Sequence, residues 1–114
     1  MELWHNPRCT KSRQAKELLD ERGATYTERR YLDSPPTAEE LDAVLTAMGK
    51  EPWEITRMGE GVADELGLKT APKDRAAWIA TLVAHPILIE RPILVTDDGR
   101  AAVGRPTEAI ADLL

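Results

Sequence analysis

Cysteine is nearly absent from this chain of 114 residues, which contains one, Cys9. A single cysteine cannot form an internal disulfide, which fits a reducing compartment and leaves two interpretations of Cys9, an inert core thiol or a reactive one. The length and the 42% hydrophobic content predict one domain over residues 1–114, with a core that needs neither metals nor disulfides.

Long hydrophobic runs are also absent. The longest apolar stretch, Ile87–Val95, is interrupted by Glu90, Arg91 and Pro92, so no window reaches the roughly 18 apolar residues of a membrane span. Met1–Pro7 lacks the positive start and apolar run of a signal peptide. We therefore expect a soluble, cytoplasmic protein without a membrane association.

The chain also lacks an excess of basic residues, and its formal net charge is −5. This charge argues against a general nucleic-acid binder. Its distribution is uneven, since no acidic residue occurs between Leu3 and Lys16. The basic residues of that segment are His5, Arg8, Lys11, Arg13 and Lys16. Cys9 thus lies in a locally positive segment of an acidic protein.

The first third of the chain predicts a strand, a helix and a second strand. The strands are Met1–Trp4 and Thr25–Leu32, which is rich in Thr and Tyr. Between them, apolar residues recur at helical spacing over Ala15–Arg22, and Gly23 is placed as a C-terminal cap.

A block of helices is predicted next. Ser34-Pro35-Pro36 stops the second strand, and Thr37 to Glu40 matches a capping box. Two helices are predicted from apolar faces at helical spacing. The first face is Leu41, Val44, Leu45 and Met48, and the second is Ala76, Ile79, Ala80 and Val83. One or two short helices are expected within Pro52–Gly67, and His85-Pro86 ends the block.

The last part predicts two strands and a helix. Ile93–Thr96 and Ala101–Val103 flank the turn signal Asp97–Arg100, and Pro106 is expected at the first position of the closing helix. The complete order is that of an α/β thioredoxin-like fold (βαβ … ββα) with a helical insertion at about 34–86.

In this order Cys9 falls between the first strand and the first helix. Free backbone N–H groups and the positive end of the helix dipole favour a thiolate or a bound anion there. Because its neighbours are polar and basic, we interpret Cys9 as a reactive thiol rather than a core residue. The residue three positions on is Ser12, so an external thiol has to resolve any mixed disulfide.

Two other kinds of site are poorly supported. A phosphatase-type loop would need an arginine where Ala15 stands. Cys9, His5 and His85 do not form a recognised ligand set, so no metal is expected.

The segment His5-Asn6-Pro7-Arg8-Cys9-Thr10-Lys11-Ser12-Arg13 resembles the active-site segment of the glutaredoxin-linked arsenate reductase (ArsC) family. Three further segments match that family's pattern in order, so the resemblance covers essentially the whole chain. They are Tyr31–Thr37, His85–Ile93 and Gly104–Pro106. Thr10 stands where well-matched arsenate reductases carry glycine, and the segment is more similar to the Asn-Pro-Arg-Cys-x-Lys-Ser-Arg branch.

The resemblance implies a thioredoxin-like fold with a helical insertion and a nucleophilic Cys9. It also implies three arginines around an oxyanion, which fall on Arg57, Arg91 and Arg105. Guanidinium groups suit this role because they stay charged and bind oxyanions bidentately. For each arginine, a solvated surface charge or a structural ion pair is the alternative.

The resemblance places a cis-proline beside the cysteine at Pro92, for which an ordinary strand-entry proline is the alternative. It also suggests that His5 lowers the pKa of the thiol through hydrogen bonds, although His5 could simply end the first strand. Ser12 and Arg13 are expected to orient the thiolate or the anion, or to be ordinary first-turn residues.

The function that the resemblance implies is reduction of arsenate to arsenite. A Cys9–arsenate adduct would be resolved by glutathione and glutaredoxin, with glutathione as co-substrate and no bound cofactor. Two alternatives remain. One is a regulator resembling the Spx group, which binds RNA polymerase, although Ser12 replaces its usual second cysteine. The other is a monothiol, glutaredoxin-like thiol transferase, which has no need for distant arginines.

Overall fold

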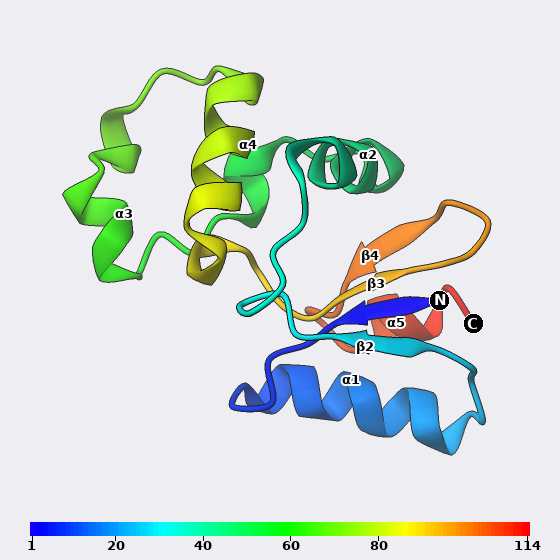
Figure 1. Cartoon of the computed structure of the whole chain (residues 1–114). Helices are drawn as coiled ribbons and strands as arrows, with labels where there is room; N and C mark the ends of the chain where they lie inside the picture. The colour runs from blue at the N-terminus through cyan, green and yellow to red at the C-terminus, as the bar shows by residue number, and fades with distance from the viewer. The chain divides into compact units, whose positions relative to one another are not determined.

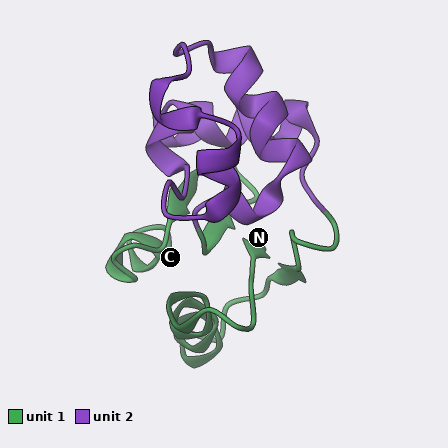
Figure 2. Ribbon diagram, turned by 90° about the vertical axis from the view of Figure 1, so that its left-hand side faces the viewer, with its two compact units in different colours: residues 1–34, 91–114 green, residues 35–90 purple.

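The chain divides into two units, which are coloured separately in Figure 2. The computed structural model describes residues 1–114. Unit 1 combines Met1–Ser34 with Arg91–Leu114, and unit 2 is the intervening segment Pro35–Glu90. The helical insertion predicted at about 34–86 therefore corresponds to unit 2 and continues to Glu90.

A four-stranded mixed sheet organises unit 1 (Figure 1). Its strands are β1 (Glu2–Trp4), β2 (Thr27–Arg29), β3 (Ile93–Val95) and β4 (Ala101–Val103), in the spatial order β2-β1-β3-β4. Strand β1 runs parallel to β2 and antiparallel to β3, which pairs antiparallel with β4. The parallel β1–β2 pair is joined by a helix, as parallel strands require.

Two helices pack on one face of this sheet, α1 (Thr10–Glu21) and α5 (Glu108–Ala111). The core between them is a cluster of five side chains with no exposed surface. It consists of Leu3, Ala15, Leu19, Leu94 and Ile110. Because Leu3 and Leu94 belong to the two central strands, this cluster anchors the middle and the C-terminal part of α1 against the middle of the sheet.

Two predictions for unit 1 need correction. Strand β2 is shorter than Thr25–Leu32, because the N–H groups of Asp33 and Ser34 bond to the Arg30 carbonyl in a turn that leaves the sheet. The last helix begins at Glu108 rather than at Pro106. The Ala109 N–H bonds to the Pro106 carbonyl three residues back, so a tighter turn precedes α5.

Unit 2 consists of helices. The α-helices are α2 (Ala38–Met48), α3 (Gly61–Glu65) and α4 (Arg75–Ala84), and the 3-10 helices are η1 (Pro52–Ile55), η2 (Leu68–Thr70) and η3 (Pro86–Leu88). An isolated bridge joins Thr56 to Ile89. The stretch Pro52–Gly67, predicted to hold one or two short helices, contains η1 and α3.

Helix α2 begins and ends as its sequence predicts. The Thr37 hydroxyl accepts a hydrogen bond from the Glu40 N–H at 3.1 Å, and the Glu40 carboxylate accepts one from the Thr37 N–H at 3.0 Å. At the other end, Gly49 adopts φ = 67°, a left-handed conformation that glycine takes without steric cost.

The apolar face predicted for α4 is wrong in part. Ala76 and Ala80 are exposed, and the buried residues are Trp78, Ile79 and Leu82. The larger side chains occupy the core because burial of apolar area increases with side-chain size.

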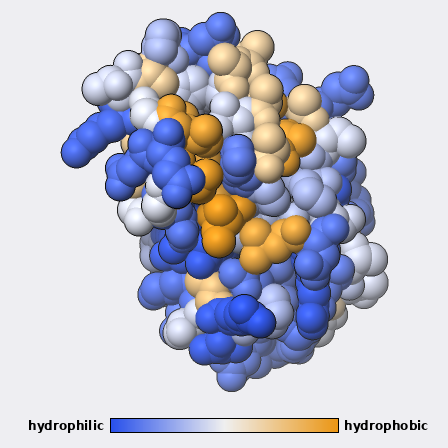
Figure 3. All heavy atoms as spheres, turned by 60° about the vertical axis from the view of Figure 1, so that its left-hand side comes forward, coloured by the Kyte–Doolittle hydropathy of each residue, from blue (hydrophilic) through white to orange (hydrophobic).

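None of the helices has the length and apolar character needed to cross a membrane. Apolar side chains nevertheless reach the surface, and Figure 3 shows one face on which they lie among hydrophilic residues. The large ones are Leu32, Met58, Leu66, Ile87 and Leu114.

Candidate active site at the start of helix α1

Cys9 is the N-cap residue of α1 and is partly exposed. Its backbone has extended dihedral angles, and its carbonyl accepts the first helical hydrogen bond from the Arg13 N–H at 3.0 Å. The free N–H groups of the first turn therefore lie beside the Cys9 side chain. They favour a negative charge at this position, because they carry the positive end of the helix dipole.

Several groups act in opposite directions on the pKa of the Cys9 thiol. Burial raises it, since the thiolate loses water. The backbone N–H of Ser12, the guanidinium of Arg91 and the backbone N–H of Lys11 lower it. The donors prevail, and the pKa of Cys9 lies below its ordinary value. A thiol in this setting is a better nucleophile at neutral pH.

Arg91 and Arg105 both lie at the Cys9 sulfur. The Arg91 guanidinium is close enough to Cys9 to lower the pKa of its thiol. Arg105 Nη2 lies 3.4 Å from Cys9 Sγ, and Arg105 Nε donates to the Arg91 carbonyl at 2.7 Å. Two nitrogens of Arg91, Nε and Nη1, are buried and have no hydrogen-bond partner. Buried donors without partners are rare in proteins, so they mark a place suited to an oxygen-rich anion.

Gly104 holds the segments of Arg91 and Arg105 close together. Its N–H donates to the Pro92 carbonyl at 2.8 Å. A Cβ atom on Gly104 would lie 2.7 Å from Pro92 Cγ and 2.6 Å from Ile110 Cδ1. The peptide bond before Pro92, the predicted cis-proline, is cis, and so is the one before Pro106.

His5 acts on this site through Ser12 rather than by touching the sulfur. His5 Nδ1 lies 2.7 Å from the Ser12 hydroxyl, which also accepts a hydrogen bond from the Asn6 N–H at 3.0 Å. Burial lowers the pKa of His5, and Lys16, Arg30 and Arg13 add to this against the opposing effect of Glu28.

A neutral His5 has one ring N–H, and its partners assign the tautomer. Nε2 faces the Glu28 carboxylate at 3.4 Å, which can only accept, so Nε2 carries the hydrogen. Nδ1 then accepts from the Ser12 hydroxyl. This chain of contacts fixes Ser12, whose backbone N–H acts on Cys9.

Arg13 forms hydrogen bonds to the loop before α1. Its Nη1 donates to the Pro7 carbonyl at 3.0 Å, and its Nη2 donates to the Thr10 hydroxyl at 3.2 Å. These bonds connect the two sides of Cys9, so Arg13 orients the loop that carries the thiol.

Arg57 belongs to unit 2, where carboxylates hold its guanidinium. Nε donates to Glu60 at 3.2 Å and Nη1 to Glu90 at 3.3 Å. Its part in binding an oxyanion stays a prediction.

Two contributors were not identified from the sequence. Asn6 is buried, its side-chain oxygen accepts from the Arg8 N–H at 3.0 Å, and its carbonyl accepts from the Cys9 N–H at 3.0 Å. The Asn-Pro pair is typical of such a turn, so a local signal existed. The contact of Glu28 with His5 depends on the pairing of β2 with β1, for which the sequence carries no local signal.

The fold and the site define a class of protein in which a cysteine of lowered pKa is the N-cap of the first helix, beside a mixed sheet. The ArsC family model matches residues 4–113, and the chain belongs to this family. An arsenate reductase from Vibrio cholerae superposes with a TM-score of 0.92 at 36% identity, over 100% of this chain and 98% of that chain. The α/β thioredoxin-like fold with a helical insertion is thus confirmed.

Two further similar proteins match this chain over its whole length. An arsenate reductase of Neisseria meningitidis serogroup A is 40% identical over 115 residues, covering 100% of this chain and 97% of that protein. A protein in the glnII region of Streptomyces viridochromogenes, described as uncharacterized, is 51% identical over 117 residues, covering 100% of this chain and 98% of that protein.

Proposed function

We propose that this protein reduces arsenate to arsenite at Cys9. The observation that carries the proposal is the Arg91 guanidinium, of which two buried nitrogens lack partners, beside a thiol of lowered pKa. Arsenate resembles phosphate, a tetrahedral oxyanion with about two negative charges near neutral pH. The arsenate reductases among the similar proteins support the same substrate.

The first step is attack of the Cys9 thiolate on arsenic(V). A sulfur–arsenic bond forms, one arsenic–oxygen bond breaks, and the oxygen leaves as water after taking up two protons. Arg91 and Arg105 hold the remaining oxygens, and in this proposal Arg57 is the third arginine. Cationic donors next to the developing charge are the largest single source of acceleration in such reactions.

Because the chain has no second cysteine, external thiols complete the reaction. The glutathione sulfur bonds to arsenic and a second water leaves. A glutaredoxin thiolate then attacks the glutathione sulfur, the sulfur–arsenic bond breaks, and its electron pair reduces arsenic(V) to arsenic(III). Water finally releases arsenite and restores the Cys9 thiol. The scheme needs no bound cofactor and suits the reducing cytoplasm.

The test is arsenate-dependent NADPH oxidation in the presence of glutathione, glutaredoxin and glutathione reductase. Cys9→Ser should abolish turnover. Arg91→Ala should lower kcat/KM for arsenate by about a hundredfold, since it removes an oxyanion donor. Arg22→Ala is the matched control, because Arg22 is exposed and its side chain has no hydrogen-bond partner.

Absence of turnover in the folded wild-type protein would overturn the proposal. The same variants separate the alternatives predicted from the sequence. A monothiol transferase would regain its activity in Arg91→Ala once the pH exceeds the raised pKa of Cys9, because disulfide exchange needs the thiolate but no oxyanion donors. A polymerase-binding regulator would show no turnover and would retain the polymerase alpha subunit in a pull-down.

A further inference from the structure

A hollow of about 300 Å³ lies in unit 1 next to the loop that carries Cys9. Pro7 and Arg8 line it on the side of that loop, and Arg30, Leu32 and Asp33 line it from the turn after β2. We refer to it as the Arg8–Asp33 hollow. Its volume is at the lower end of those that hold small ligands, so it suits a short peptide rather than a protein segment.

The charged groups of the hollow are of both signs. The Arg8 guanidinium has no hydrogen-bond or ion-pair partner, since only its backbone N–H is bonded, to Asn6. The Asp33 carboxylate likewise has none, and only its backbone N–H is bonded, to the Arg30 carbonyl. Arg30 contributes a second positive charge, with Nε 3.5 Å from Glu28.

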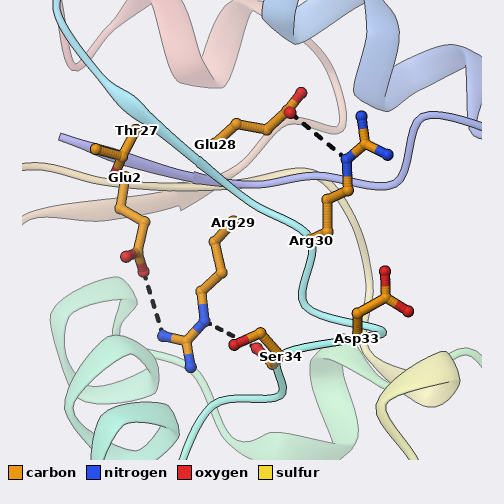
Figure 4. A pocket seen from close by; sticks show the side chains of 7 residues that line it. All are labelled: Glu2, Thr27, Glu28, Arg29, Arg30, Asp33 and Ser34. Carbon is orange, nitrogen blue, oxygen red and sulfur yellow. Dashed lines mark hydrogen bonds and ion pairs between the residues drawn. The ribbon is translucent and has the colours of Figure 1, made fainter.

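Figure 4 shows the neighbouring hollow along β2, which shares Arg30 and Asp33 with the Arg8–Asp33 hollow. A dashed line joins Arg30 to Glu28, and another two join Arg29 to Glu2 and Ser34. No dashed line reaches Asp33. The charges along β2 are thus paired with one another, whereas Asp33 and Arg8 remain available to a ligand.

We propose that the Arg8–Asp33 hollow binds the small thiol that attacks the Cys9 adduct, a zwitterion with two carboxylates and one ammonium, as in glutathione. Arg8 and Arg30 would bind the carboxylates and Asp33 the ammonium. Arg8 and Asp33 supply one unpaired charge of each sign and Arg30 shares its charge with Glu28, so the hollow matches a ligand that carries both signs. This inference rests on the proposed function, because it names where the co-substrate of that reaction is held.

The hollow adjoins the residue that precedes the reacting cysteine. Arg8 directly precedes Cys9, and adjacent Cα atoms are about 3.8 Å apart. A tripeptide held at Arg8 by a terminal carboxylate therefore spans enough length to bring its sulfur to arsenic on Cys9. There the thiol forms a sulfur–arsenic bond, an arsenic–oxygen bond breaks, and the oxygen leaves as water with the thiol proton, while arsenic remains pentavalent.

The first test measures binding without turnover. Titration of the protein with S-methylglutathione, which cannot react, should shift the backbone NMR signals of Arg8 and of residues 30–33. Asp33→Asn and Arg8→Ala should each weaken binding by about fivefold, the effect of one exposed ionic contact. The controls Glu17→Gln and Arg22→Ala change exposed residues outside the hollow and should bind as the wild type does.

A second ligand checks the role of charge. S-methylglutathione with both carboxylates esterified should bind about fivefold or more weakly to the wild type, with little further loss in Arg8→Ala. Shifts confined to another surface, or equal affinities for the wild type and Asp33→Asn, would overturn the inference.

The kinetic test separates this inference from the proposed function. In the coupled assay, Asp33→Asn should raise KM for glutathione about fivefold and leave KM for arsenate unchanged. Normal arsenate turnover with an unchanged KM for glutathione in Asp33→Asn would refute the subsite and leave the reductase in place. Conversely, a protein without arsenate turnover that binds S-methylglutathione in the hollow would refute only the reductase.

Discussion

At the residue scale, two kinds of donor act on the Cys9 sulfur, backbone N–H groups and guanidinium groups. The backbone N–H groups of Lys11 and Ser12 belong to α1. The guanidinium groups belong to Arg91 and Arg105, which follow unit 2 in the sequence. Lys11, Ser12 and Arg91 lower the pKa of the thiol enough to outweigh the cost of its partial burial. Arg105 adds a positive charge at the sulfur, which also favours the charged form. The arginines should therefore control both the charge of the nucleophile and the position of its substrate.

The pH dependence of Cys9 reactivity follows from this arrangement. The pKa of Cys9 is lowered, so the thiolate persists below the ordinary range and is lost only as the pH falls through the lowered pKa. Arg91→Met removes a donor to the thiolate, so its pKa should rise. Iodoacetamide alkylation measured against pH should inflect at a higher pH in Arg91→Met than in the wild type. An unchanged inflection would show that Arg91 does not stabilise the thiolate; Arg22→Ala is the control.

At the scale of elements, the site depends on how closely two loops of unit 1 approach. The loop before β3 presents Arg91, and the segment after β4 presents Arg105. They are joined by the bond from the Gly104 N–H to the Pro92 carbonyl and by the bond from Arg105 Nε to the Arg91 carbonyl. A side chain at Gly104 has no space between Pro92 and Ile110.

Gly104→Ala should therefore separate these loops. We expect a loss of about 1–3 kcal/mol in the free energy of unfolding, the usual range for overpacking, and a fall in arsenate turnover. Urea denaturation and the coupled assay measure the two effects. Gly59→Ala is a matched control, because nothing lies within 4 Å of a Cβ atom there and its backbone is not left-handed. Equal stability of the two variants would contradict the close approach.

Helix α2 offers a second prediction at this scale. Thr37→Ala removes a capping box and should lower the free energy of unfolding by about 1 kcal/mol. Thr107 is also an N-cap, of α5, but its side chain makes no capping hydrogen bond. Thr107→Ala should therefore lower the free energy of unfolding by less than Thr37→Ala in the same urea titration. A larger loss in Thr107→Ala would refute the stabilising role of the capping box at Thr37.

At the scale of the whole molecule, a buried histidine connects the site to stability. The pKa of His5 is lowered by burial in the folded protein, whereas in the unfolded chain it takes its ordinary value of about 6.5. Below that value the unfolded chain binds a proton that the folded protein resists. Stability should therefore decrease as the pH falls through this range.

The corresponding test is urea denaturation between about pH 5 and pH 8. His5→Gln removes the titrating group and should flatten the pH dependence, whatever its effect on stability at neutral pH. His85→Gln removes the other histidine of the chain and should retain the wild-type slope. If His5→Gln keeps that slope, the burial of a neutral His5 does not account for it.

Much of the fold was predictable from local signals. The capping box at Thr37, the glycine after α2 and the turn between β3 and β4 act within a few residues, so their effect does not depend on the rest of the chain. The end of β2 and the buried face of α4 were mispredicted, because pairing with a neighbour and competition for the core decide them.

The sequence by itself determined that Cys9 begins the first helix in a basic segment. It also determined that the chain has no second cysteine to resolve a mixed disulfide or adduct of Cys9. Only the tertiary structure decided which side chains meet at the sulfur. Arg105 is 96 residues away in sequence, and its approach to Cys9 depends on the pairing of β1, β3 and β4. The contact of His5 with Glu28 likewise depends on strand register. Such contacts join distant residues, so no local pattern specifies them.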